Sequence, residues 1–320
     1  MIEKFNNRRI YVIAAVAILL LSLPIFYIDT PYIMFILAQM NFYTLFAFGF
    51  NYLFGFTRQL FLAVGAFAGM GAYITGIILR EGIMGPVEAI ILATLLVGSL
   101  GYIVSTISVK RKLAVIFTGV FTLAITLVFT NLTMALVDIT GGESGFRISN
   151  INLMADWLPN YVSYYYLSSA VLLFTTIISY HLLYNTKLGY AYKCILDDEL
   201  SAELIGIDVQ KVKTLTALFA SALIGFSGSI YGLFSQLIAP SYFAFASVDL
   251  PVQLIVILGG KATLLGPYIG SAVITVLNEL LRLLGPLTLL IYGITLLFLL
   301  AFFRNGIVEF LKRKFETWLF

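Results

Sequence analysis

Residues 185–213 read NTKLGYAYKCILDDELSAELIGIDVQKVK, a polar stretch between two long apolar runs. Asp197 or Asp198 can cap the start of a short helix within it, and Gly206 is placed to end that helix about two turns later. The rest of the chain is almost continuously apolar, so this segment is the strongest indication of function. We expect a short, free-standing helix between two membrane spans.

The expected helix carries one narrow apolar stripe flanked by acids. Leu196, Leu200 and Leu204 recur every four residues, a spacing that puts them on one face of a helix. Glu199 and Glu203 fall near the positive N-terminal end, where carboxylates are favourable. A stripe of this kind suits docking into the groove of another protein better than folding alone.

The composition of the chain as a whole is that of a multi-span membrane protein. Of the 320 residues, 61% are hydrophobic and 11% are charged, whereas roughly 25% charged residues is normal for soluble domains. Apolar runs of about 17 to 25 residues are each long enough to cross a hydrocarbon core of roughly 30 Å. The sequence predicts an all-α, polytopic membrane protein of about ten transmembrane helices, forming a single transmembrane domain over residues 1–320. The expected spans are residues 10–28, 32–54, 60–79, 87–107, 113–137, 164–184, 214–236, 249–260, 264–284 and 287–303.

Positive charges set the expected orientation. Sixteen of the 19 lysines and arginines fall on one side of this arrangement, and three, Arg80, Arg147 and Arg282, fall on the other. Because positively charged loops stay in the cytosol, we expect a multi-pass cell-membrane protein whose N- and C-termini are cytosolic. Residues 185–213 are then a cytosolic loop within this domain. The first apolar run lacks a small-residue cleavage site and is interpreted as a retained span.

The chain lacks the residues that several classes of function require. One cysteine, Cys194, and one histidine, His181, cannot form an intrachain disulfide or a metal site of the His and Cys type. The segment 259–263 lacks the upstream glycine and the hydroxyl directly after lysine that a phosphate loop needs. The net charge of +3 comes from residues that flank the spans, so it indicates no nucleic-acid partner. We expect no enzyme activity, no metal and no cofactor.

Two glycine-containing interruptions divide the apolar pattern. The first, GFNYLFGFTRQLFLAVGAFAG at 49–69, and the second, GGKATLLGP at 259–267, each place a glycine and a basic residue before an apolar run. The run at 249–260 is too short to cross comfortably, which predicts a broken or re-entrant helix, and such breaks usually line a cavity. The pattern allows a two-half internal repeat, whose interface would hold a translocation path.

Polar residues and glycines near these interruptions are the candidates for that path. They are Gln39, Asn41, Asn51, Gly55, Gln253, Gly259 and Gly260. For each polar residue the alternative is a hydrogen bond to a neighbouring helix. Asp249 and Glu279 fall at or near span ends and are interpreted as an interfacial anchor and a local pair with Arg282. An ion-driven mechanism is therefore disfavoured, and we expect the energy source to lie in another polypeptide.

A glycine-rich loop, TGGESGF at 140–146, joins the fifth and sixth expected spans on the external side. Its glycines indicate a tight backbone turn. Two readings are open: the loop receives a soluble binding protein, or it is a solvated connection. The residues concerned are Gly141, Gly142, Glu143, Ser144 and Gly145.

Taken together, these stretches resemble the permease subunits of ABC importers for branched-chain amino acids. The resemblance rests on GFNYLFGFTRQLFLAVGAFAGMGAY at 49–73, TGGESGF at 140–146, LGYAYKCILDDELSAELIGIDVQKVK at 188–213, LGGKATLLGPYIGS at 258–271 and FFRNGI at 302–307. The chain departs from the family pattern at Tyr190, Lys193 and Leu196, where arginines are usual, and at Ala262 and Asn305, where glycine and proline are common.

The resemblance implies that Asp197 to Gly206 form a coupling helix seated on a cytosolic ATP-binding subunit. The residues that would couple to the ATPase are Asp197, Asp198, Glu199, Leu200, Glu203, Leu204 and Gly206. A second permease subunit and an extracytoplasmic solute-binding protein would complete the importer. Its solute would be a branched-chain amino acid or a related small polar solute. The alternative is an autonomous secondary transporter or channel for a small polar solute, which would need its own coupling-ion site.

Overall fold

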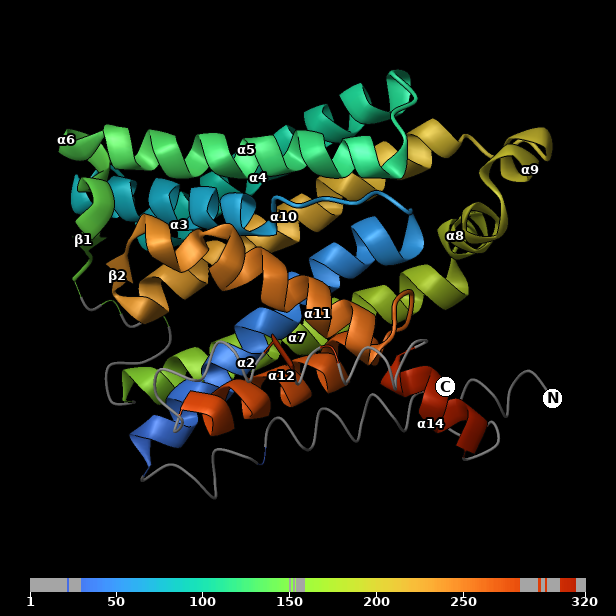
Figure 1. The fold of residues 1–320 in the computed structure, drawn as a ribbon. Helices are drawn as coiled ribbons and strands as arrows, with labels where there is room; N and C mark the ends of the chain where they lie inside the picture. The colour runs from blue at the N-terminus through green and yellow to red at the C-terminus, as the bar shows by residue number, and fades with distance from the viewer. Residues whose placement is uncertain are drawn as a thin grey trace.

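The structure is a computed structural model that describes residues 22, 30–149, 151, 153, 159–282, 293, 294, 297 and 306–314. Long helices run side by side between two ends of the molecule (Figure 1). The strands β1 and β2 lie at one end, called here the β end, and helices α8 and α9 project at the other, called the α9 end. The first and last expected spans, 10–28 and 287–303, lie almost wholly outside the described residues.

Five helices among the described residues are long and apolar enough to cross a membrane. They are Pro31–Phe56, which comprises α2 (Pro31–Phe50) and a π-helical turn (Asn51–Phe56), α4 (Pro86–Lys110), α5 (Val115–Ala135), α7 (Asn160–Asn185) and α10 (Val209–Ser235). Shorter helices accompany them: α3 (Val64–Arg80), α11 (Leu250–Gly259) with a π-helical turn before it (Phe245–Asp249), and α12 (Gly266–Arg282). The predicted all-α membrane fold is confirmed, with span positions close to those expected.

Small elements complete the two ends. At the β end lie α6 (Val137–Thr140), two 3₁₀ turns (Gly142–Ser144 and Pro240–Phe243), and the strands β1 (Phe146–Arg147) and β2 (Leu237–Ile238). At the other end lie α8 (Lys187–Asp197), α9 (Glu199–Leu204) and α14 (Ile307–Lys314). The strands pair antiparallel, with Phe146 opposite Ile238, and this two-residue ladder is the described β-structure of an otherwise helical chain.

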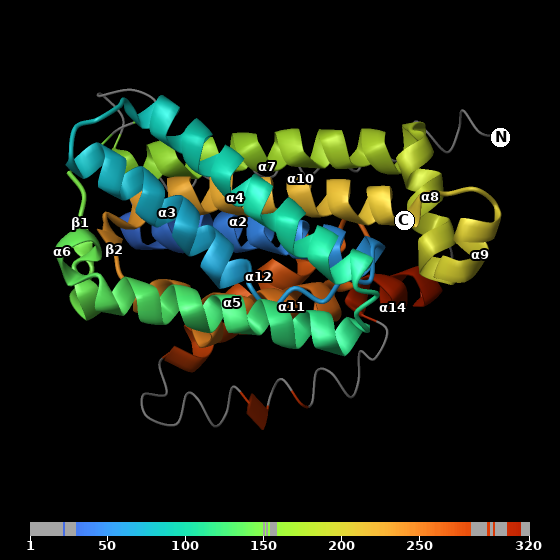
Figure 2. The same cartoon turned by 90° about the horizontal axis from the view of Figure 1, so that it is seen from above.

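Helix α10 lies inside the bundle and α5 at its edge (Figure 2). Of an apolar stretch of 18 residues in each helix, 67% is buried in α10 and 28% in α5. Glycines let α10 approach α3 backbone to backbone. A Cβ at Gly228 would come within 2.2 Å of the Ala68 carbonyl oxygen, and one at Gly71 within 2.1 Å of the Gly225 oxygen. These glycines therefore allow the two helices to pack closely within one subunit.

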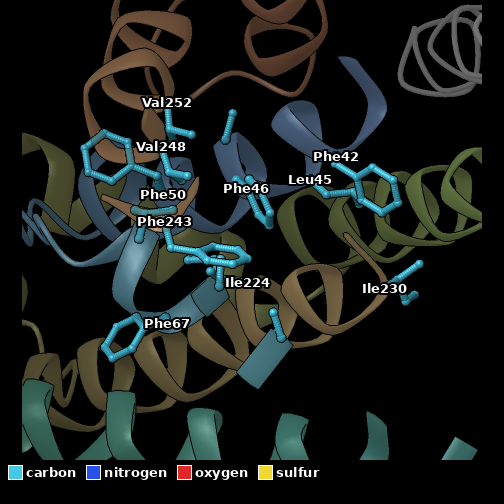
Figure 3. Close-up of a cluster of buried hydrophobic side chains, with 14 of the residues drawn as sticks. Phe42, Leu45, Phe46, Phe50, Phe67, Ile224, Ile230, Phe243, Val248 and Val252 are labelled. Atoms are coloured by element: carbon cyan, nitrogen blue, oxygen red, sulfur yellow. The ribbon is translucent and has the colours of Figure 1, made fainter. Parts of the chain in front are cut away.

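The apolar core lies where α2, α3, α10 and α11 meet (Figure 3). Phe42, Phe46 and Phe50 of α2 are fully buried there, together with Phe67 of α3 and Ile224 of α10. The spacing of four residues between Phe42, Phe46 and Phe50 places all three on one side of α2. This core fixes α2 against the other helices and so positions the two interruptions that follow.

Both expected interruptions are present. The segment 57–63 separates α2 from α3, and 260–265 separates α11 from α12. Helix α11 has 10 residues, about 15 Å of helix, which is half of the hydrocarbon thickness. Arg58 and Ala262 hold matching left-handed conformations, with φ of 54° and 57°. Two turns of like geometry therefore follow the two helices at corresponding places.

Candidate functional site

Helix α9 begins at a side-chain cap. Asp198 accepts hydrogen bonds from the backbone N–H of Ser201 at 2.8 Å and from its hydroxyl at 2.6 Å. The Ser201 hydroxyl bond, followed by the backbone bond, holds the pKa of the Asp198 carboxyl below its ordinary value. Asp197 ends α8 and does not open the helix, so the expected helix Asp197–Gly206 is corrected to Glu199–Leu204. Gly206 follows with φ of +87° and ends the helical segment as expected.

Three large apolar side chains of α9 and its C-terminal cap are uncovered. Leu200, Leu204 and Ile205 are 71%, 87% and 69% exposed, and we call these three residues the α9 face. Leu196 was expected on the same stripe, but it belongs to α8 and packs half-buried against a cluster that includes Tyr192. The extended backbone at Asp198 separates the two helices, so the periodicity of four does not continue across it.

Three contacts tie helices α8, α9 and α10 to the interruption after α2. Lys213 Nζ donates to Glu199 Oε1 at 2.6 Å, and the Lys213 carbonyl accepts from Gln59 Nε2 at 3.1 Å. The Arg58 guanidinium donates to the Leu196 carbonyl. Gln59 is buried and its Oε1 accepts from the Ser105 hydroxyl at 2.6 Å. Gln59 and Lys213 were not among the predicted site residues, because nothing local to either one marks its partner.

The two interruptions also contact each other through Asn51. Its Oδ1 accepts from the Ala262 N–H at 2.8 Å, and its Nδ2 donates to the Thr263 carbonyl at 2.9 Å. Gly55 lies beside this pair, where a Cβ would come within 2.2 Å of Asn51 Oδ1 and 2.7 Å of the Ala262 nitrogen. A side chain at Gly55 would therefore push the two turns apart.

Two cavities lie at opposite ends of α2. One, near the β end, has a volume of about 470 Å³ and is lined by residues of α2, α11 and α12, including Gln39 and Tyr43; we call it the β-side cavity. The other has a volume of about 750 Å³ and is lined by Gly55, Gly260 and Thr263 among others; we call it the α9-side cavity. Residues of α11 line both cavities, so both lie beside this short helix.

The stretch between the cavities is closed by direct contacts. The hydroxyls of Thr44 and Ser271 lie 2.6 Å apart, and the rings of Phe48 and Tyr268 pack edge to face at 5.5 Å. Asn51 adds its two bonds to the turn after α11. The arrangement is a pair of cavities that the α2 contacts keep apart.

The predicted path residues fall in different places. Gln39 lines the β-side cavity, and Gly55 and Gly260 line the α9-side cavity. Asn41 instead donates to the hydroxyls of Ser168 and Ser169 on α7, at 3.2 and 2.9 Å, which is the alternative that the sequence left open.

Two further predicted path residues lie on α11. Gln253 is partly buried, and its Nε2 has no hydrogen-bond partner among the described residues. Gly259 packs against α12, where a Cβ would come within 2.0 Å of the Gly266 oxygen. Gly259 therefore allows the broken helix to approach its neighbour closely.

The expectation that Asp249 is an interfacial anchor is wrong. Its side chain is fully buried, and its two oxygens accept from the N–H groups of Val64 at 2.7 Å and Gly65 at 3.1 Å. The carboxylate thus satisfies the free N–H groups that begin α3, where negative charge is favourable. It joins the break before α3 to the half-helix α11, and no sequence signal connects the two.

The expected pair of Glu279 with Arg282 involves a side chain outside the described residues. Glu279 itself is partly buried, accepts from the Tyr32 hydroxyl across the bundle, and lines the β-side cavity. Glu279 was not among the residues predicted to line a path.

The glycine-rich loop at the β end is held in place on several sides. Gly141, Gly142 and Gly145 have φ between 63° and 75°, and a Cβ at Gly145 would come within 1.9 Å of the Ile238 oxygen. Phe146 is buried under the Arg80 guanidinium, 4.9 Å from the ring centroid. Glu143, Ser144 and Arg147 remain exposed. The loop therefore presents charges of both signs on a fixed backbone.

The family model described as "Branched-chain amino acid transport system / permease component" matches residues 32–300, which cover both interruptions, α9 and most of the lining of both cavities. The chain belongs to this family. It is a multi-pass membrane transport permease, in agreement with its apolar helices.

Two relatives of this permease come from Methanocaldococcus jannaschii. The probable branched-chain amino acid transport permease protein LivH is 27% identical over 68% of this chain and 70% of the relative. The probable permease protein LivM is 24% identical over 73% and 72%. The ribose import permease protein RbsC of Haemophilus influenzae is 28% identical over 61% of this chain and 59% of its own. No solved structure matches the permease.

Proposed function

We propose that the permease is the membrane subunit of an ABC importer, and that a separate ATP-binding subunit supplies its energy through α9. The observation that carries this proposal is the α9 face, which exposes Leu200, Leu204 and Ile205 at the end of the molecule beyond the long helices. Leucines exposed to this extent outside a membrane favour a protein partner. Helix α9 is only 6 residues long, and a helix this short is not stable by itself in water. A partner would therefore stabilise α9 and cover these side chains.

A movement of α9 would reach the two interruptions by direct contact. Glu199 is bonded to Lys213, whose carbonyl accepts from Gln59 in the turn after α2. That turn leads into α3, whose first N–H groups are capped by Asp249 at the base of α11. Closure of the ATPase subunits would therefore shift the turn after α2 relative to α11, opening one cavity while the other closes.

The remaining assignments follow from this arrangement. The α9 end faces the cytosol together with both termini, which agrees with the excess of lysine and arginine expected there. The β end faces outward, and its loop of Gly141–Gly145 receives an extracytoplasmic solute-binding protein. A second permease subunit, identical or different, completes the membrane part.

Branched-chain amino acids are the favoured solutes, because the family description and two relatives name them. Related small polar solutes form the second group, since one relative is named for ribose. An autonomous transporter or channel would need its own coupling-ion site. The buried carboxylate of Asp249 is already engaged as a helix cap, which argues against that use.

The test is solute-stimulated ATP hydrolysis and uptake in proteoliposomes that hold this chain, its partner permease, the ATP-binding subunit and the binding protein. Leucine, isoleucine, valine, urea, acetamide and ribose are compared. Stimulation by one of them establishes coupling and the solute class.

Variants then locate the coupling. Removal of residues 197–206, or Leu200→Asp with Leu204→Asp, should abolish stimulation and co-purification of the ATP-binding subunit while the chain still inserts in the membrane. Gln210→Ala, at an exposed position of the same cytosolic segment but off the α9 face, is the control and should behave as wild type. Normal uptake by the α9 variants at normal membrane levels would refute the coupling role.

A further inference from the structure

A further cavity, between α7 and α10, has a volume of about 670 Å³ and a predominantly apolar surface; we call it the apolar groove. Helices α7 and α10 flank it, and α8 lies at its α9 end (Figure 2). Phe174 of α7 and Phe219 of α10 line it and are 65% and 63% exposed, so the described part of the chain leaves both rings largely uncovered. A small polar solute would lose its hydrogen bonds to water in such a groove, which therefore suits an apolar ligand.

The groove is about as long as one leaflet of a membrane is thick. Its lining runs along α7 from Ala170 to Leu182, about 18 Å of helix, and along α10 from Thr216 to Phe226, about 15 Å. The hydrocarbon core of a bilayer is roughly 30 Å thick, which leaves about 15 Å for each leaflet. The lining begins ten residues into α7 from the β end and stops three residues before the α9 end. The groove therefore lies in the leaflet on the α9 side.

Polar and basic residues replace the apolar ones where the groove reaches the α9 end. His181 and Asn185 lie three and seven residues after the groove-lining Ile178, so they continue its face of α7, and both are exposed. Lys187 begins α8 directly before the groove-lining Leu188, and it is exposed without an ion-pair partner among the described residues. A change from apolar side chains to lysine is typical of the boundary between acyl chains and head groups.

The rim of the groove favours a lipid over another helix. Helices that associate in membranes meet through small residues or shared polar groups, as α3 and α10 do at Gly71 and Gly228. The rim carries Phe174, Ile178 and Phe219 instead, which are large and exposed. A flexible acyl chain can fill a groove between such side chains, whereas a helix backbone cannot approach them closely.

We propose that the apolar groove binds an anionic phospholipid of the leaflet on the α9 side, with one acyl chain between α7 and α10 and its phosphate at Lys187. A phosphate beside this lysine gains a charge-assisted contact. A zwitterionic head group carries its own cation and gains less, so the site prefers anionic lipid. This binding site goes beyond the proposed importer function and does not depend on it.

The bound acyl chain would also contact the junction that leads to α9. Tyr52 of the π-helical turn after α2, Tyr192 of α8 and Thr216 of α10 line the groove. The Tyr192 hydroxyl lies 2.9 Å from that of Thr216, and its ring lies 6.4 Å from the ring of Tyr52. An acyl chain packed on these side chains would hold α8, and with it α9, against the turn after α2. We therefore expect the lipid to increase solute-stimulated ATP hydrolysis, an effect that rests on the proposed function.

The experiment uses the full importer in vesicles of phosphatidylcholine with or without phosphatidylglycerol. A trace of either lipid carries a photoactivatable group on one acyl chain, and mass spectrometry identifies the labelled peptides. Ala170→Trp fills the groove from an exposed position of its lining, and Lys187→Glu reverses the head-group charge. The matched controls are Ala124→Trp, at an exposed alanine of α5, and Lys110→Glu, at the exposed end of α4; neither residue lines the groove.

In wild type, phosphatidylglycerol should label residues 170–182 and 216–226 about fivefold more than phosphatidylcholine does, the ratio that corresponds to one lysine near an anionic lipid. Ala170→Trp should reduce labelling by both lipids, and Lys187→Glu should remove the preference, whereas the two controls match wild type. The preference is a ratio measured within one variant, so a general loss of folded protein does not produce this result. Solute-stimulated ATP hydrolysis should fall severalfold without phosphatidylglycerol in wild type and should not respond to it in Lys187→Glu.

Equal labelling by the two lipids, or labelling of α5 as strong as that of the groove, would overturn the inference, because lipid that surrounds any membrane protein gives the same result. Cross-links from the groove to a second permease subunit, without lipid labelling, would also overturn it. Specific labelling with no effect of phosphatidylglycerol on ATP hydrolysis would overturn the effect on coupling. Absence of stimulation by any solute in every vesicle would instead overturn the proposed function, and the labelling ratio would still decide the lipid site.

Discussion

Lys213 Nζ lies 2.6 Å from Glu199 Oε1, and this ion pair joins α9 to the N-terminal part of α10. The Lys213 side chain is 11% exposed and that of Glu199 37%, so water screens the pair in part and its effect on stability is modest. Its importance lies in position, because the Lys213 carbonyl also accepts from Gln59 after α2. The ion pair is the first step between the α9 face and the interior.

We expect Glu199→Lys to place two positive charges together and to reduce solute-stimulated ATP hydrolysis at least tenfold. The swap Glu199→Lys with Lys213→Glu restores the attraction and should recover most of the stimulation. Both variants are measured in proteoliposomes at matched membrane levels. A double variant as inactive as the single one would show that the pair does not transmit the movement.

Asn51 bonds to both Ala262 and Thr263, so Asn51→Ala removes two hydrogen bonds between the interruptions. We expect ATP hydrolysis without solute to rise severalfold and uptake to become poorly coupled, because the turns after α2 and α11 are no longer joined. Asn131→Ala is the control, since exposed Asn131 is bonded, among the residues that the structure describes, only to the Leu127 carbonyl of its own helix. If both variants took up the same amount of solute for each ATP hydrolysed, this role would be contradicted.

Asp249→Ala leaves the N–H groups of Val64 and Gly65 without their buried acceptor. The loss should lower the free energy of unfolding by about 2–5 kcal/mol, as expected for two buried donors deprived of a charged partner. Asp249→Asn retains an amide oxygen and should lose less. Thermal unfolding in detergent measures the difference, with exposed Asp138→Ala on α6 as the control. Similar melting temperatures for the Asp249 and Asp138 variants would rule out the cap.

Gly228→Ala puts a methyl group 2.2 Å from the Ala68 carbonyl oxygen, a backbone atom that cannot move alone. Helices α3 and α10 must separate, which should destabilise the protein by about 1–3 kcal/mol. Gly85→Ala is the matched control, because the atoms nearest to its Cβ would belong to the flexible carboxylate of Glu88. Chemical unfolding of the two variants gives the comparison, and equal midpoints would be inconsistent with the close crossing.

The cap of α9 gives a prediction for pH. Because hydrogen bonds from Ser201 hold the pKa of Asp198 below its unfolded value, the stabilisation is complete above that unfolded value, about 3.9, and is lost as pH falls through the folded pKa. Protection of residues 199–206 from hydrogen exchange, corrected for the intrinsic rate, should therefore fall below about pH 4.

Two substitutions distinguish the effect of the Asp198 cap from the effect of any nearby acidic group. Asp198→Asn keeps an acceptor that does not titrate over this range, so its protection should be independent of pH. Asp197→Ala removes a neighbouring acid that ends α8 and should titrate as wild type does. Protection that falls with pH in Asp198→Asn as it does in wild type would exclude the cap as the cause.

Much of the architecture could be predicted because it depends on local properties. The long apolar runs became helices at nearly the expected places, and the short run before Gly260 became the half-helix α11. The helix at Asp198 was foreseen from its cap and its terminal glycine. The prediction was wrong about Leu196, because an extended residue divides α8 from α9, and no sequence period reveals such a break.

Less of the candidate site could be predicted from the sequence. Asn51 and Gly55 were selected for their position in an interruption, and the structure shows that they face the turn after α11. Asn41 had the same appearance in sequence yet is bonded to α7. Which side of α2 each residue occupies depends on how the whole helix is rotated in the bundle, and that rotation is set by the packing of its phenylalanines.

By itself, the sequence determined a helical membrane permease with two interrupted segments and a projecting α9, because hydrophobic length, capping and glycine act over a few neighbouring residues. Only the tertiary structure decided which polar groups meet. Asp249 reaches Val64 across 185 residues of chain, Asn51 reaches Thr263 across 212, and Tyr32 reaches Glu279 across 247. Buried polar groups must find partners wherever packing brings them, and that choice is made by the bundle as a whole.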